Sequence, residues 1–157
     1  MRRKNRVQVF VLFITISFLY VSCASFGEES ISLRSGTYES YFQSEIENGY
    51  TPGINTIYAD GTGYFELSIG KCAVYIEEYQ WEINEDMLIV RNLRSYTYDP
   101  CKDAVLEVYE SYTQYFEILN YTPSVIEMTL RKDVYADGTE EYFDYPESYF
   151  WEYAGSQ

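Results

Sequence analysis

The chain has 157 residues, with 11 Lys or Arg against 25 Asp or Glu, a net charge of −14 at pH 7 and no histidine. This length suits a single domain. So acidic a protein repels phosphate groups, which excludes nucleic acid as a partner and disfavours anionic lipid head groups. Without histidine, neither a His-based catalytic triad nor a His-ligated zinc site can form.

Residues 1–22 have the pattern of an export signal peptide. Four positive charges come first, on Arg2, Arg3, Lys4 and Arg6. The almost unbroken apolar run from Val7 to Val21 is shorter than the about 20 residues of a membrane-spanning helix. Cleavage after Ser22 would remove these four basic side chains and no acidic ones, leaving seven basic against 25 acidic side chains.

The segment Leu19-Tyr20-Val21-Ser22-Cys23 resembles the lipobox of bacterial lipoproteins. The resemblance implies that the Cys23 thiol carries a diacylglycerol and that Cys23 becomes the new N-terminus. Residues 23–35 then form a polar, lipidated tether, and the protein is exported and anchored to a membrane of the cell envelope, on its periplasmic face or at the cell surface. Plain cleavage near the same point and an uncleaved N-terminal membrane helix are the alternatives.

Two further cysteines, Cys72 and Cys101, remain once Cys23 is set aside. An even pair in an oxidising compartment predicts a disulfide, although two separate thiols are the alternative. The bridge would close a loop of about 30 residues, which contributes roughly 3 to 4 kcal/mol in the chain-entropy model.

Residues 36–157 alternate between strand and turn patterns, which predicts one all-β domain. Strands are expected over residues 37–42, 54–58, 64–69, 72–84, 87–90, 115–119 and 125–130. Residues 92–103 have the pattern of the longest loop, and residues 104–113 fit either a strand or a helical turn. In the last strand Ile126, Met128 and Leu130 share the inward face.

The strand over residues 72–84 changes its apolar phase. Val74 and Ile76 are apolar at even positions, whereas Tyr79, Trp81 and Ile83 are apolar at odd ones. This predicts a β-bulge at Glu77-Glu78 and places Trp81 on the core side, beside Tyr79 and Ile83.

The sequence Tyr-Ala-Asp-Gly-Thr occurs twice, at residues 58–62 and 135–139. Asp-Gly between strands is typical of a tight hairpin turn. A calcium loop is the alternative, but the closely spaced carboxylates that such a loop needs are absent from both copies. We therefore expect two hairpin turns and no metal site.

The C-terminal segment is unusually aromatic over residues 142–151. Strands flanking Asp137-Gly138 predict an irregular C-terminal hairpin. Exposure of so many aromatic side chains to water is unfavourable. The segment is therefore expected to dock on its own domain or on a partner.

The motifs shared with a known family are Gly36-Thr37-Tyr38, residues 58–62, residues 79–83 with Asp86 and Leu88, residues 116–119 and residues 126–130. Their order resembles the small lipocalin-like domains of many bacterial lipoproteins. The resemblance implies a small antiparallel β-barrel or half-barrel within residues 36–157. It implies little about function, because one fold serves many functions.

The sequence predicts neither catalytic residues nor a cofactor. Neighbouring acids such as Glu77 and Glu78 point to opposite faces of a strand, so they cannot act together on one substrate. Aromatic side chains are the positive signal, with 19 Tyr, 9 Phe and 2 Trp. They either build a small barrel or line a site for a small apolar or sugar-like ligand.

Three hypotheses follow for function. The leading one is a lipid-anchored binding or interaction module of the cell envelope, without catalysis and with its ligand-binding residues unknown. A structural lipoprotein with a filled barrel and an acidic surface is the second hypothesis, and a carboxylate-based hydrolase is the third. The partners expected are a membrane, reached through the N-terminal lipid, and a small ligand or an envelope protein.

Lipidation is testable in cells. Metabolic labelling with palmitate should mark the wild-type protein, because its acyl chains are attached through Cys23, and should not mark Cys23→Ser. Label that persists in the variant would refute the assignment.

Overall fold

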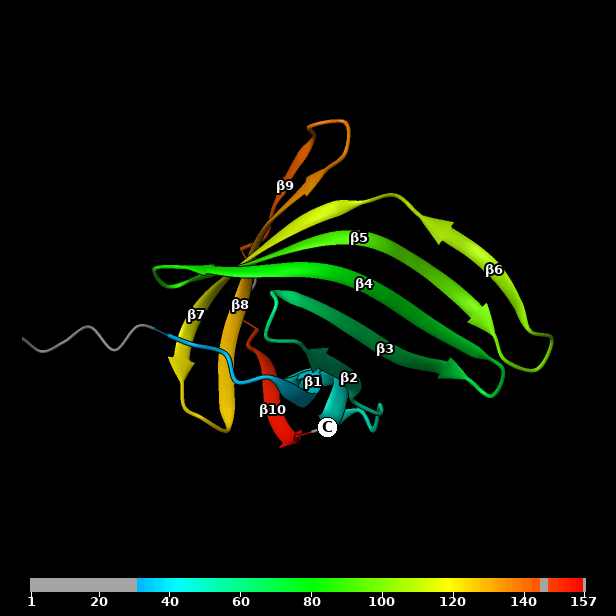
Figure 1. Cartoon of the computed structure of the whole chain (residues 1–157), viewed down its shortest axis with the longest axis horizontal. Helices are drawn as coiled ribbons and strands as arrows, with labels where there is room; N and C mark the ends of the chain where they lie inside the picture. Colours follow the sequence, from blue (N-terminus) through cyan, green and yellow to red (C-terminus); the bar gives the residue numbers. More distant parts are fainter. Residues whose placement is uncertain (1–30, 145–146, 157) are drawn as a thin grey trace, which may run out of the picture. The chain divides into compact units, whose positions relative to one another are not determined.

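The computed structural model describes residues 31–144 and 147–156 (Figure 1). The expected signal peptide, residues 1–22, and the expected lipidation site, Cys23, lie outside the described residues. Of the expected tether, residues 31–35 are described. Among the helices of the described residues, none is long and apolar enough to cross a membrane.

The described part of the chain is built almost entirely of strands, as the sequence predicts. The elements in chain order are β1 (Gly36–Phe42), α2 (Gln43–Glu47), β2 (Gly53–Ile57), β3 (Thr62–Gly70), β4 (Ala73–Asn84), β5 (Met87–Asp99), β6 (Ala104–Tyr109), β7 (Tyr112–Tyr121), β8 (Val125–Tyr135), β9 (Glu140–Tyr142) and β10 (Tyr149–Gly155).

Eight of these strands form a closed antiparallel barrel in the order β10-β1-β2-β3-β4-β5-β7-β8. The ring closes because β10 pairs with β1 on one side and with β8 on the other (Figure 1). Strand β6 pairs with the second half of β5, and β9 pairs with the end of β8, so both lie outside the ring. The prediction of an all-β barrel is confirmed, and the barrel is closed rather than half open.

The C-terminal segment contributes more than a hairpin. As predicted, β8 and β9 form a hairpin across Asp137-Gly138. Strand β10 then leaves that hairpin and closes the barrel, with Trp151 only 3% exposed. The described aromatic residues of β10 therefore dock on their own domain.

The two copies of Tyr-Ala-Asp-Gly-Thr form the same turn, as predicted. In each copy the Tyr N–H donates to the Thr carbonyl, at 3.0 Å for Tyr58 and 2.9 Å for Tyr135. The Asp carboxylate accepts the Thr N–H, at 3.0 Å from Thr62 and 2.8 Å from Thr139. Gly61 and Gly138 have φ of 83° and 84°, a left-handed conformation that favours glycine.

A packed apolar core fills part of the barrel interior. Its buried residues include Tyr38, Ile57, Leu88, Ile118, Ile126 and Met128. Leu33, from the segment expected to be tether, is also buried in this core. The Tyr38 hydroxyl donates to the Arg34 carbonyl at 2.6 Å, so residues 31–35 cover this end of the barrel.

The predicted bulge lies on the neighbouring strand. Glu78 pairs with Arg94 and Tyr79 pairs with Asn92, so the extra residue is Leu93 of β5. Strand β4 does not change phase, because Tyr75 and Glu77 line the same interior as Tyr79. The prediction that β4 carries the bulge at Glu77-Glu78 is therefore wrong. The register between β4 and β5 does shift at this position, but the extra residue lies in β5.

The predicted inward group of β4 is confirmed. Tyr79 is 2% exposed, and Trp81 and Ile83 are partly buried against the core. The Trp81 indole N–H donates to the Thr62 carbonyl at 3.0 Å, which satisfies its polar atom at the barrel end.

The predicted long loop over residues 92–103 is wrong. Strand β5 continues to Asp99, and only a short turn separates it from β6. The inward positions after the bulge are the polar residues Ser95, Thr97 and Asp99, so this half of the strand lacks the apolar alternation that marks strands in a sequence. Residues 104–109, ambiguous in the sequence, form strand β6.

Close packing of β3 on β4 makes Gly63 a sensitive position. A Cβ atom at Gly63 would lie 2.2 Å from a ring carbon of Tyr79, which is fully buried and cannot move aside. We expect Gly63→Ala to lower the free energy of unfolding by about 1 to 3 kcal/mol, as overpacking does.

Urea unfolding measures this cost, and a double-mutant cycle tests its cause. In a Tyr79→Leu background, which removes the ring, Gly63→Ala should cost less than half as much. An equal cost in both backgrounds would show that the ring contact is not responsible.

Candidate functional site

The barrel interior also contains a cavity of about 240 Å³, which borders the packed core along Tyr79, Val90, Phe116 and Trp151. Most of its wall is aromatic or aliphatic, from Phe42, Phe65, Leu67, Tyr75, Tyr79, Val90, Tyr112, Phe116, Leu130, Tyr149 and Trp151. The cavity reaches the surface beside α2, where Glu45 is exposed. It is smaller than the roughly 300 to 1,000 Å³ of typical ligand pockets, which suits a compact ligand.

The carboxylate of Glu77 projects from β4 into this cavity and is only 6% exposed. Its Oε2 accepts hydrogen bonds from the hydroxyls of Tyr112 at 3.1 Å and Tyr75 at 3.4 Å. Those two hydroxyls also lie 3.3 Å from each other. Burial raises the pKa of Glu77, although the Asn92 amide and the two tyrosine hydroxyls partly oppose that rise.

Polar groups near Glu77 are incompletely paired. Within the described residues, Glu77 Oε1, both amide atoms of Asn92 and the Ser95 hydroxyl have no hydrogen-bond partner. The Asn92 amide lies close enough to Glu77 to lower the pKa of its carboxyl group. It nevertheless makes no hydrogen bond of normal geometry with that group. Unpaired buried polar atoms are costly and are candidates for contact with a ligand or water.

A second buried carboxylate, Asp133, lies on β8 and is 9% exposed. Burial raises its pKa to about 6; the Gln114 amide lowers it, and the charges of Glu141 and Glu77 raise it further. Gln114 lines the cavity, whereas Asp133 is not among the lining residues. The charge of Glu77 therefore raises the pKa of Asp133, although only Glu77 lines the cavity.

A hydrogen-bonded chain crosses the floor of the cavity. The Tyr79 hydroxyl donates to Asn55 Oδ1 at 2.8 Å, and the Asn55 amide donates to the Ser40 hydroxyl. All three residues are buried and come from β4, β2 and β1. Burial raises the pKa of Tyr79, so its hydroxyl stays protonated and remains a donor.

Aromatic rings form the wall near α2. The Tyr149 ring lies 4.7 Å from the Phe42 ring and stacks on Phe116 at 5.7 Å. Burial raises the pKa of Tyr149 to about 12. This wall combines β1, β7 and β10, so it exists only when the barrel is closed.

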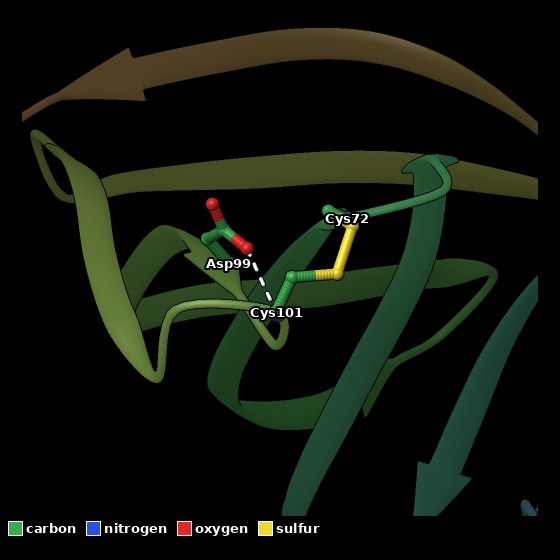
Figure 2. Close-up of side chains that lie close together, drawn as sticks. All are labelled: Cys72, Asp99 and Cys101. Atoms are coloured by element: carbon green, nitrogen blue, oxygen red, sulfur yellow. Dashed lines mark hydrogen bonds between the residues drawn. A yellow bond between two sulfur atoms is a disulfide. The ribbon is translucent and has the colours of Figure 1, made fainter.

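The predicted disulfide between Cys72 and Cys101 is confirmed, with a Cα–Cα distance of 5.5 Å. Figure 2 shows Asp99 beside it, where Asp99 Oδ1 accepts the Cys101 N–H at 2.9 Å. Cys72, Asp99 and Cys101 lie close enough to suggest a metal site, but disulfide sulfurs are not thiolates and cannot ligate a metal as thiolates do. The bridge ties the β3–β4 turn to the turn after β5.

The ligand-binding residues cannot be identified from the sequence, and their placement in the structure gives the reason. In the sequence Glu77 is notable for the predicted bulge and for its acidic neighbour Glu78, whereas the structure places Glu77 in the cavity without Glu78, so this pair does not converge. The buried residues of β5, Asn92 and Ser95, were assigned to a loop. The signal in the sequence that could indicate these residues is the series of polar residues at alternating positions directly after a predicted strand, which is compatible with the strand continuing.

Comparison of the chain with protein-family models, with curated proteins and with solved structures finds no match. The assignment of a function therefore depends on the geometry of the barrel.

Stability should fall as pH rises through the range in which Asp133 ionises. The pKa of Asp133 is raised from 3.8 to about 6 on folding, so the folded state binds the proton more tightly and is destabilised between these values. Asp133→Asn should raise the free energy of unfolding at pH 7 by roughly 1 to 3 kcal/mol and leave it nearly unchanged at pH 4.

Urea unfolding at both pH values checks this result. Asp137→Asn is the matched control, because the pKa of Asp137 is lowered by the Thr139 N–H and hydroxyl in an exposed turn. The control should not gain stability at pH 7. An Asp133→Asn protein no more stable than wild type at pH 7 would contradict the prediction.

Proposed function

We propose that this chain is a lipid-anchored binding module of the cell envelope, without catalysis, whose barrel holds a small ligand. The observation that carries the proposal is the aromatic cavity with a buried carboxylate in its wall. A barrel that served only as structure would gain stability from apolar packing throughout, as in the core around Leu88 and Met128. Location at a membrane rests on the export and lipobox pattern that ends at Cys23.

The cavity is more suited to binding than to hydrolysis. A carboxylate-based hydrolase places two carboxyl groups on either side of the bond that it cleaves. Two carboxylates line the cavity, Glu77 in its wall and Glu45 at its opening, whereas the buried acids Asp99 and Asp133 do not line it. Glu45 is exposed, and its carboxylate accepts the Phe42 N–H at 3.1 Å, so it is engaged at the start of α2. Apolar and aromatic walls with a few polar groups are typical of pockets that bind small ligands.

Binding can be tested with the uncharged fluorescent dye N-phenyl-1-naphthylamine and two matched variants. Leu67 lines the cavity on β3, and Ile69 lies two residues further along the same strand, 53% exposed and outside the cavity. Saturable binding should occur with wild type and with Ile69→Trp, and should weaken at least tenfold with Leu67→Trp, because the larger ring fills the cavity.

Thermal melting of Leu67→Trp shows whether the barrel is intact in that variant. A folded Leu67→Trp protein that binds the dye as wild type does would refute the cavity as the site. Absence of saturable binding to wild type would favour the structural role with a filled barrel instead.

A further inference from the structure

Glu77 lines the cavity, and one of its carboxylate oxygens lacks a well-formed hydrogen bond. Its Oε2 accepts hydrogen bonds from the hydroxyls of Tyr112 and Tyr75, whereas Oε1 makes no hydrogen bond of normal geometry among the described residues, although the Asn92 amide lies near this carboxylate. The side chain is more than nine-tenths buried, so solvent does not compensate freely for that missing contact. A buried carboxylate oxygen without a partner is stabilised most by a donor that also carries positive charge.

None of the seven basic side chains in the described part of the chain lines the cavity. Four form ion pairs elsewhere: Arg91 with Glu82, Lys102 with Asp99, Arg131 with Glu117 and Lys132 with Glu140. Arg34 and Arg94 lie over the rings of Tyr153 and Tyr96, and Lys71 is exposed in the turn after β3. The cavity carboxylate therefore has no positive partner of its own.

Aromatic rings lie near the same carboxylate. The ring of Tyr75 lies 5.6 Å from that of Tyr109 and 6.2 Å from that of Phe65, and Tyr112 bonds to the same carboxylate. The face of an aromatic ring attracts a cation, most strongly where water is excluded.

The remaining charges act in the same direction. Glu45 stands where the cavity reaches the surface, and acidic residues outnumber basic ones by 25 to 11 in the chain. This field concentrates cations at the opening and repels carboxylates or phosphates. An anionic ligand would also meet Glu77 itself.

We propose that the ligand of this cavity is a small molecule with a protonated amine, whose N–H groups bond to Glu77 Oε1 while the rings of Tyr75 and Tyr112 flank the charge. This inference rests on the proposed function, since it requires the cavity to bind a ligand. It goes further by naming the group that is recognised: an amine with N–H donors, in preference to an alcohol or a carboxylate of the same shape.

Three probes of matched shape test the inference: benzylamine, benzyl alcohol and benzoate, each titrated at pH 7 and followed by NMR. Wild type should bind benzylamine at least tenfold more tightly than benzyl alcohol, and benzoate more weakly than either. Glu77→Gln should reduce the preference for the amine to twofold or less, because the charge is removed and the shape is kept. Glu78→Gln, which changes the neighbouring acid outside the cavity, should keep the full preference.

The outcomes separate the two proposals. Wild type that binds benzyl alcohol as tightly as benzylamine would overturn the amine inference, while dye binding in the cavity would still support a binding module. A preference that survives in a folded Glu77→Gln protein would overturn it as well. If neither the dye nor any of the three probes bound in a saturable way, the proposed function itself would fail.

Discussion

Pairing of β10 with both β1 and β8 is the constraint on which the rest of the structure depends. Trp151 sits opposite Ser40 on one neighbour and opposite Ile126 on the other, so one residue joins the two ends of the ring. Without β10 the strands β1 and β8 would both be open edges with unpaired backbone groups. The pairing of β10 with β1 joins residues more than 100 positions apart, which makes it a costly, non-local step of folding. Closure also brings Tyr149 and Trp151 into the cavity wall.

The closed barrel divides its interior into two environments. The core around Leu33, Leu88 and Met128 is packed with apolar side chains, which stabilise the fold through the hydrophobic effect. The region around Glu77, Asn92 and Ser95 is polar, and these residues are buried and incompletely paired. Such groups lower the stability of the fold, and native proteins keep them mostly where a function requires them. The acidic interior and the aromatic wall therefore belong to the same site.

Local patterns predicted a large part of the fold. Asp-Gly within the two repeated pentapeptides indicated hairpin turns, because turn geometry depends on a few adjacent residues. Alternation predicted the inward face of Ile126 and Met128, and both are buried. The sequence does not reveal the second half of β5 as a strand, because its inward residues are polar. The prediction of the bulge names the wrong strand, because a shift of register is a property of two paired strands and the sequence of one of them does not show which holds the extra residue. Either strand of the pair can hold the extra residue.

By itself the sequence determined the all-β class, most strands and turns, the acidic charge and the pairing expected of Cys72 with Cys101. These follow from residues that are adjacent in the chain, or from composition. Only the tertiary structure decided that the barrel is closed, that Glu77 lines a cavity and that none of the basic residues in the described part of the chain lines it. The physical reason is that burial, unpaired atoms and raised pKa values depend on side chains that distant strands bring together, and no local pattern records which strands become neighbours.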